Sequence, residues 1–94
     1  MNSGHLQARR ATLDDLAELR RFWTESGLDV EMLERELTDF QVAEPNGGGP
    51  LLGAVALRII GQQGFLHSET VVEEERGKEL RERLWARALA VARN

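Results

Sequence analysis

The sequence contains no cysteine and no tyrosine. Without cysteine, the chain has no disulfide, no thiolate-bound zinc and no cysteine nucleophile. The two histidines, His5 and His67, are too far apart to show metal-ligand spacing, so we expect no metal site. Neither an apolar run of the roughly 20 residues that cross a bilayer nor a signal-peptide pattern is present. We therefore expect a cytoplasmic protein that does not bind membranes.

An excess of basic residues is also missing. The 94 residues include 12 Lys and Arg against 16 Asp and Glu, a formal net charge of −4. Such a balance disfavours nucleic-acid binding, which relies on a positive field. Apolar residues make up 41% of the chain and charged residues 30%, which is ordinary for a globular domain. A chain of this length holds one modest core, so we expect residues 1–94 to form a single domain.

The first half of the chain predicts one strand and two helices. We expect the strand over residues 5–11 and a helix that begins at Thr12, where Asp15 completes a capping box. Gly27 ends this helix, and Asp29 caps a shorter second helix. Helical spacing assigns the apolar positions of the two helices: Leu13, Leu16, Leu19, Phe22 and Trp23, then Val30, Leu33 and Leu37.

The second half predicts three strands and a final helix. We expect strands over residues 40–43, 51–60 and 65–72, joined by Gly-rich turns at 44–50 and 61–64. A charged loop then leads into a helix over residues 79–93. The order β-α-α-β-β-β-α indicates an α+β fold with a mostly antiparallel sheet flanked by helices.

The join between the last strand and the last helix is the segment most suggestive of chemistry. Arg76, Gly77 and Lys78 stand where the helix opens. A helix N-terminus offers unpaired backbone N–H groups and the positive end of the dipole, which together can hold a phosphate. The alternative is a solvated, charged turn, which is the commoner meaning of such a sequence.

The whole chain resembles the N-terminal half of the GNAT superfamily of acyl-CoA-dependent N-acetyltransferases. The segments RRATLDDLAELRRFW, FQVAEPNGGGPLLGAVAL and FLHSETVVEEERGKEL are similar to the family's first strand and helix, its second and third strands, and its fourth strand with the pyrophosphate loop. The resemblance implies binding of acetyl-CoA and transfer of its acetyl group to a primary amine.

The resemblance also implies roles for particular residues. The backbone of Val71 and Val72 would meet the pantetheine arm, and the pyrophosphate would lie on the loop and first helical turn, formed by Arg76, Gly77, Lys78, Glu79, Leu80 and Arg81. Glu69 is the candidate general base, and the alternative is an exposed strand carboxylate. His67 lies two residues earlier, on the same face of a regular strand, and could share the role. The alternative for His67 is an ordinary surface or partly buried histidine.

Two features depart from the family pattern. Glu79 and Arg81 occupy positions where the family has glycines, so a carboxylate and a bulky side chain stand where phosphates would bind. The chain also ends at Asn94, before the family's fifth strand, which predicts a truncated fold whose fourth strand is an open edge. We therefore expect a homodimer, and a catalytically inactive, dimeric interaction module is the alternative to an enzyme. Trp23 and Trp85 are expected in the core or an interface.

Overall fold

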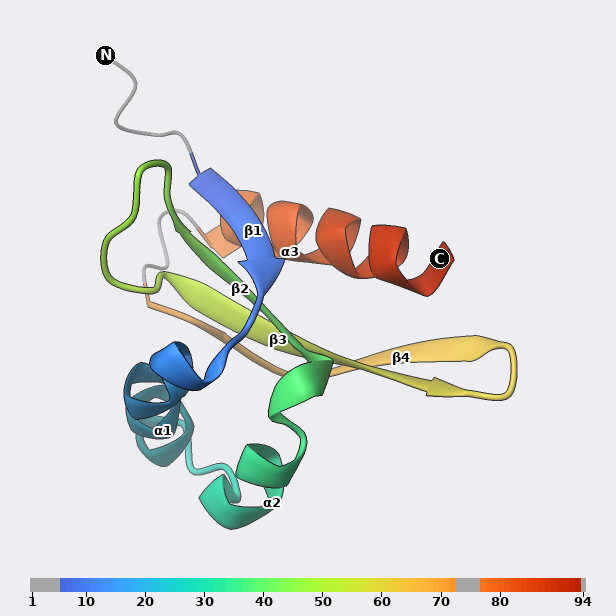
Figure 1. Ribbon diagram of the computed structural model, residues 1–94, viewed down its shortest axis with the longest axis horizontal. Helices are drawn as coiled ribbons and strands as arrows, with labels where there is room; N and C mark the ends of the chain where they lie inside the picture. The colour runs from blue at the N-terminus through green and yellow to red at the C-terminus, as the bar shows by residue number, and fades with distance from the viewer. Residues whose placement is uncertain (1–5, 73–76, 94) are drawn as a thin grey trace.

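The computed structural model describes residues 6–72 and 77–93, and it has the expected order of elements (Figure 1). In chain order the elements are β1 (Leu6–Arg10), the 3₁₀ turn η1 (Leu13–Asp15), α1 (Leu16–Glu25), α2 (Val30–Arg35), η2 (Leu37–Asp39), β2 (Phe40–Pro45), β3 (Gly53–Ile60), β4 (Gln63–Val71) and α3 (Gly77–Arg93). The expected strands and helices are all present, and their ends differ from the expected ones by a few residues.

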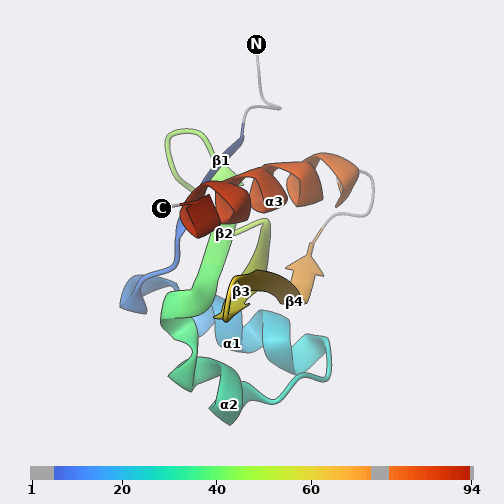
Figure 2. The same cartoon turned by 90° about the vertical axis from the view of Figure 1, so that its right-hand side faces the viewer.

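The four described strands form one antiparallel sheet in the order β1-β2-β3-β4. Short connections join β2 to β3 and β3 to β4, as the Gly-rich turns predict. The helices α1 and α2 cover one face of the sheet and α3 covers the other, so the molecule has three layers (Figure 2). Among the described strands, β4 lies at an edge of the sheet next to the start of α3.

Each face of the sheet has its own apolar core. On the α1/α2 face, Trp23 and Phe40 are fully buried, and their ring centroids are 5.2 Å apart. On the α3 face, Leu80 and Leu84 pack on the strands. Gly53 lets α3 come close, because a Cβ atom there would lie 3.0 Å from a backbone oxygen of β4 and 3.5 Å from the Leu84 side chain. The two helical layers are therefore held to the sheet by burial of apolar surface.

The helix boundaries follow the capping residues. The Thr12–Asp15 capping box forms, and Asp29 accepts a hydrogen bond from the Met32 backbone N–H at 3.1 Å. Gly27 has a φ of 73°, as a left-handed helix terminator requires. The expectation that Leu13 lies on the buried stripe is wrong, since its side chain is 77% exposed. The first turn is 3₁₀, with three residues per turn, which rotates Leu13 away from the sheet.

Strand β4 contains a β-bulge. Thr70 pairs with Ala54 and His67 pairs with Ala56, so Ser68 and Glu69 together oppose the single residue Val55. Ser68 has a φ of 55°, in the left-handed region that L-residues seldom adopt. The extra residue breaks the alternation of side chains along β4, so the strand presents a different face before and after it.

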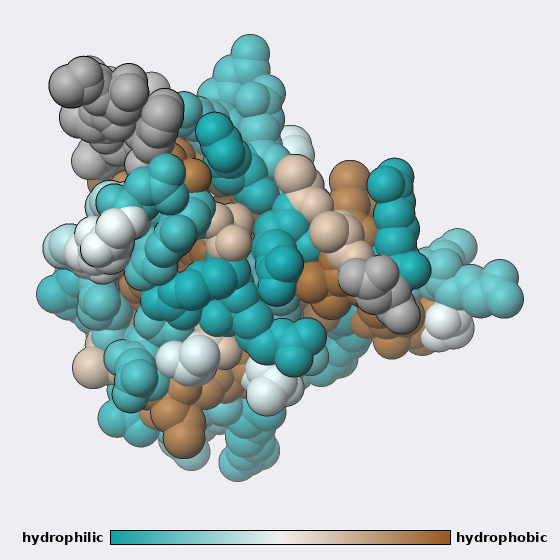
Figure 3. Space-filling model, turned by 45° about the horizontal axis from the view of Figure 1, so that its top comes forward, coloured by the Kyte–Doolittle hydropathy of each residue, from teal (hydrophilic) through white to brown (hydrophobic). Residues whose placement is uncertain are grey.

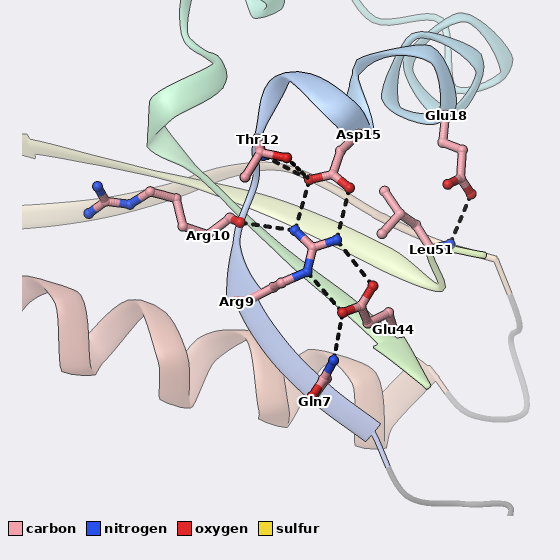
Figure 4. Close-up of polar contacts among 8 residues, drawn as sticks. All are labelled: Gln7, Arg9, Arg10, Thr12, Asp15, Glu18, Glu44 and Leu51. Atoms are coloured by element: carbon pink, nitrogen blue, oxygen red, sulfur yellow. Dashed lines mark hydrogen bonds and ion pairs between the residues drawn. The ribbon is translucent and has the colours of Figure 1, made fainter. Parts of the chain in front are cut away.

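A network of charged side chains links β1, the start of the first helix and β2 (Figure 4). The Arg9 guanidinium donates to both Asp15 oxygens at 2.9 Å and to both Glu44 oxygens at 2.9 and 3.1 Å. Gln7 donates to Glu44 at 2.6 Å. Hydrogen bonding to Arg9 is the main reason that the pKa values of Asp15 and Glu44 are lowered. Both carboxylates are buried, so Arg9 stabilises charges that would otherwise be costly.

We predict that the substitution Arg9→Met destabilises the fold by about 2–3 kcal/mol, because it leaves two buried carboxylates without a counterion. The value is below that of a fully buried pair since the Arg9 side chain is 35% exposed. Chemical denaturation would measure it. Arg20→Met, which breaks the exposed pair with Glu34, is the matched control and should change the unfolding free energy far less.

The same variant should lose part of its pH dependence. Carboxylates with lowered native pKa values add stability above their unfolded values of 3.8 and 4.5, and this stability is lost as the pH falls through the native values. The wild type should therefore lose stability steeply below about pH 4, and Arg9→Met more gradually. Equal slopes in the two proteins would show that Arg9 does not set these pKa values.

Candidate functional site

The end of β4 presents backbone groups to an open edge. The Val72 N–H donates to the Leu52 carbonyl at 3.0 Å, and Gly53 faces Val71 across the ladder. Because backbone groups alternate in direction along an antiparallel strand, the N–H and C=O of Val71 point away from β3. Of the two residues expected to meet a pantetheine arm, Val71 therefore has its polar backbone facing outward, and Val72 uses its N–H within the sheet.

The first turn of α3 is the next described segment after this strand end. Gly77 and Leu80 are buried, whereas Lys78 and Glu79 are exposed. The N–H groups of a helix's first turn have no partner within the helix, and groups of this kind can bind an anion. Arg76, which was expected to contribute here, lies outside the described residues. The first turn thus brings together backbone donors, the Lys78 cation and the Glu79 carboxylate.

The carboxylate of Glu69 points toward α3. One oxygen accepts a hydrogen bond from Arg81 Nε at 2.8 Å, and the other accepts one from Trp85 Nε1 at 2.8 Å. The Arg81 guanidinium also lies against Gly77, since a Cβ atom on Gly77 would be 2.8 Å from one of its nitrogens. Gly77 therefore makes room for Arg81, and Glu69 holds that guanidinium beside the start of the helix.

His67 does not share a face with Glu69, so that expectation is wrong. The bulge at Ser68 and Glu69 turns the His67 and Glu69 side chains to opposite faces of the sheet. The His67 ring lies 6.5 Å from the Phe40 ring, on the α1/α2 face. His67 Nδ1 is 3.0 Å from the Ser68 hydroxyl oxygen, while Nε2 is buried without a hydrogen-bond partner. The extra residue therefore interrupts the regular alternation of side-chain directions that the sequence suggests.

A cavity of about 200 Å³ separates the C-terminal end of α1 from the end of β4. It is lined by Phe22, Glu25, Ser26, Thr70, Val71 and Val72. Sequence reasoning missed it, because Glu25 and Thr70 lie 45 positions apart in no motif. Only the packing of α1 on the sheet brings them to one place.

A second hollow, of about 210 Å³, is apolar and lies between the β3–β4 hairpin and α3. Trp85 and Leu89 line it from the helix, and Leu57 and Leu66 line it from the strands. Trp85 is 42% exposed, so it is not a core residue, unlike the buried Trp23. Figure 3 shows apolar side chains gathered at this end of the molecule. The hairpin and the exposed side of α3 form what we call the hairpin patch.

In the described part of the chain, no helix is both long enough and apolar enough to span a membrane. Residues 6–72 and 77–93 contain no group of three or more histidine, aspartate or glutamate side chains arranged to hold a metal ion.

Comparison with known proteins finds likeness in structure. No family model and no curated protein matches the sequence. Rv2747 from Mycobacterium tuberculosis, solved with CoA and the ligand NLQ, is 23% identical with a TM-score of 0.76, over 92% of this chain and 57% of that one. N-acetylglutamate synthase from Neisseria gonorrhoeae, solved with CoA and N-acetyl-glutamate, is 26% identical with a TM-score of 0.71, over 96% of this chain and 23% of that one.

The chain therefore spans little more than half of the first structure and about a quarter of the second. Both are GNAT-type acetyltransferases. The two matches cover 92% and 96% of this chain. Over the part that it spans, the chain has the fold of the GNAT-type acetyltransferases.

Proposed function

We propose that this chain binds acetyl-CoA and transfers the acetyl group to a primary amine. The observation that carries the proposal is the likeness of its fold to two structures that hold CoA. The order of β4 and α3 agrees with it, because an edge strand with outward backbone groups is the element that precedes a helix N-terminus. The outward backbone groups of the strand suit an amide-containing arm, and the helix N-terminus suits phosphates.

The charges at the first turn of α3 suit the binding of a pyrophosphate. Lys78 and Arg81 are two cations near the backbone donors, and Glu79 is one opposing carboxylate. Arg81 occupies a position where the family has glycine, yet its side chain is drawn toward Glu69 by the 2.8 Å ion pair. In our proposal Arg76, Gly77, Lys78, Glu79, Leu80 and Arg81 form the phosphate site, and Val71 and Val72 contact the pantetheine arm.

The transfer forms an amide C–N bond and breaks the thioester C–S bond, while the amine loses a proton and the CoA thiolate gains one. We propose Glu69 as the base that accepts the amine's proton through a water molecule. Each Glu69 oxygen accepts one protein hydrogen bond and has lone pairs left for water. Arg81 and Trp85 would keep the carboxylate in one orientation.

The substitution Lys78→Ala should weaken CoA binding about tenfold, the effect expected for one charge-assisted contact to a phosphate. Calorimetric titration of the 94-residue chain with CoA would measure this change. Arg21→Ala removes an exposed cation on α1, across the sheet from α3, and is the matched control. A folded chain that takes up no CoA at millimolar concentration would contradict the proposal.

The substitution Glu69→Gln should lower the turnover number for acetyl transfer at least a hundredfold, because the amide cannot accept a proton. Steady-state kinetics at saturating acetyl-CoA would measure it. Trp85→Phe is the control, since it removes one hydrogen bond from Glu69 and keeps the carboxylate. If both substitutions have the same small effect, Glu69 only positions α3.

The hairpin patch supports a second candidate function, a dimeric interaction module. Its exposed apolar residues are Ile59, Ile60, Phe65, Leu66, Trp85 and Leu89. They lie beside the open edge of β4, and an edge strand is a ready template for pairing with another strand. Two copies related by a twofold axis could pair these strands and cover both patches at once.

We predict that Leu89→Lys converts the dimer to a monomer, because it places a charge in the apolar hollow. Sedimentation at several protein concentrations would measure the dissociation constant, which should rise more than tenfold. Leu13→Lys, at a more exposed leucine outside the patch, should leave it unchanged. A wild-type protein that is monomeric at every concentration would rule out the module.

A further inference from the structure

We propose that a hollow between the sheet and the last turns of α3 binds a small organic monocarboxylate with an apolar tail. The hollow has a volume of about 310 Å³, and its lining includes Arg10, Asp39, Gln41, Leu57, Ile59 and Val91. It lies at the opposite end of α3 from the first turn, so the inference goes beyond the proposed function and does not depend on it. We call it the carboxylate hollow.

The strand residues of the carboxylate hollow point to the face of the sheet that α3 covers. Arg10 stands directly opposite Gln41, and Gln41 stands directly opposite Val55. Opposed residues of an antiparallel sheet share a face, and Val55 belongs to the apolar core under α3. Leu57 and Ile59 follow Val55 at alternate positions of β3, so they point the same way. The hollow is therefore formed by side chains that face one another.

The Gln41 side chain supplies a buried amide with an unused donor. Gln41 is only 1% exposed, and its Oε1 accepts a hydrogen bond from Arg87 Nε at 3.1 Å. This contact directs the side chain toward α3, on the same side of the sheet as the hollow. Within residues 6–72 and 77–93, the Gln41 amide nitrogen Nε2 donates to no group. A buried amide N–H favours an acceptor, so the observation indicates a ligand that carries oxygen.

Two guanidinium groups give this oxygen a negative charge to match. Arg10 is exposed, and its side chain points away from the carboxylates that Arg9 binds (Figure 4). Among the described residues, the Arg10 guanidinium has no hydrogen-bond or ion-pair partner, and Arg87 uses only its Nε. A guanidinium binds a carboxylate through two parallel hydrogen bonds. Asp39 is the one carboxylate in the described lining. Two cations against one carboxylate suit a ligand with a single negative charge.

Apolar side chains set the rest of the ligand. Leu57, Ile59 and Val91 line the hollow, and Ile59 is 52% exposed. A hydrocarbon tail would cover part of this surface, and burial of apolar area favours binding. A second carboxylate at the far end of the ligand would lose water against these side chains and would be repelled by Asp39. The lining therefore favours a monocarboxylate with a short tail over a dicarboxylate.

A ligand at this place would connect two layers of the molecule. Arg10 belongs to β1 and Arg87 belongs to α3. A carboxylate held between them would join the sheet to the last turns of the helix. Because such a ligand binds the folded chain and not the unfolded one, it should raise the midpoint of thermal unfolding as its concentration rises.

The experiment compares three probes of equal chain length: hexanoate, hexanamide and adipate. Each is titrated into the ¹⁵N-labelled 94-residue chain without CoA, and amide shifts are followed by NMR. We expect hexanoate to shift the amides of Arg10, Gln41, Leu57 and Val91. Hexanoate should bind about fivefold more tightly than either other probe, because hexanamide lacks the charge and adipate adds a second one.

Two substitutions with opposite effects identify the groups responsible. Arg10→Gln should raise the dissociation constant for hexanoate about fivefold and remove its advantage over hexanamide. Asp39→Asn removes the opposing carboxylate, so it should strengthen the binding of hexanoate and strengthen that of adipate more. Arg21→Gln, at an exposed position on α1 across the sheet, is the control for the loss of one cation and should change neither constant.

The inference is overturned if hexanoate does not bind, if it binds no better than hexanamide, or if Arg10→Gln and Arg21→Gln behave alike. It is also overturned if the shifts centre on Trp85 and Leu89, because hexanoate would then bind the hairpin patch through its tail alone. Since the titrations contain no CoA, neither result depends on whether the chain binds CoA or transfers an acetyl group.

Discussion

The extra residue in β4 controls how the rest of the structure surrounds that strand. Ser68 adopts a left-handed backbone conformation opposite Val55, and the two sides of the bulge therefore point in different directions. His67 and Thr70 end on the face covered by α1, and Glu69 ends on the face covered by α3. A regular strand would have placed His67 and Glu69 together. Every residue discussed as functional on β4 takes its direction from this one irregularity.

The two helices that flank the end of β4 present opposite ends to it. The first turn of α3 carries partial positive charge, and the last turn of α1 carries partial negative charge, which Glu25 increases. In the function that we propose, a polyanionic thioester would lie at the start of α3. The end of β4 therefore lies between the positive end of α3 and the negative end of α1.

The Arg9 network also shifts pKa values, lowering those of Asp15 and Glu44. We assign no binding or catalytic role to Arg9, because it and its partners Asp15 and Glu44 are paired with one another. Shifted pKa values can mark either catalysis or architecture, and the hydrogen bonds separate the two cases. Here Asp15 and Glu44 are held as charges so that β1, the first helical turn and β2 stay together. By contrast, the Thr70 hydroxyl is buried with no partner.

The sequence by itself determined the order of the elements, the capping residues and the two Gly-rich turns. These depend on local physics: helical spacing of apolar residues, hydrogen bonds from Thr12 and Asp29 to nearby groups, and the backbone freedom of Gly27. The resemblance in the segments around β2, β3 and β4 was enough to predict the acetyltransferase-like fold, and the structural likeness confirms it. Roles assigned to Glu69 and to the first turn of α3 remain predictions.

Only the tertiary structure decided which side chains share a place. The bulge at Ser68 depends on pairing with β3. The sequence of β4 alone therefore did not predict that His67 and Glu69 lie on opposite faces of the sheet. The contact between Glu69 and Arg81 joins a strand to a helix, and its geometry follows from the packing of α3 on the sheet. Glu25 and Thr70 meet because α1 packs against β4. Local patterns specify elements, whereas sites made from residues distant in sequence depend on how those elements pack.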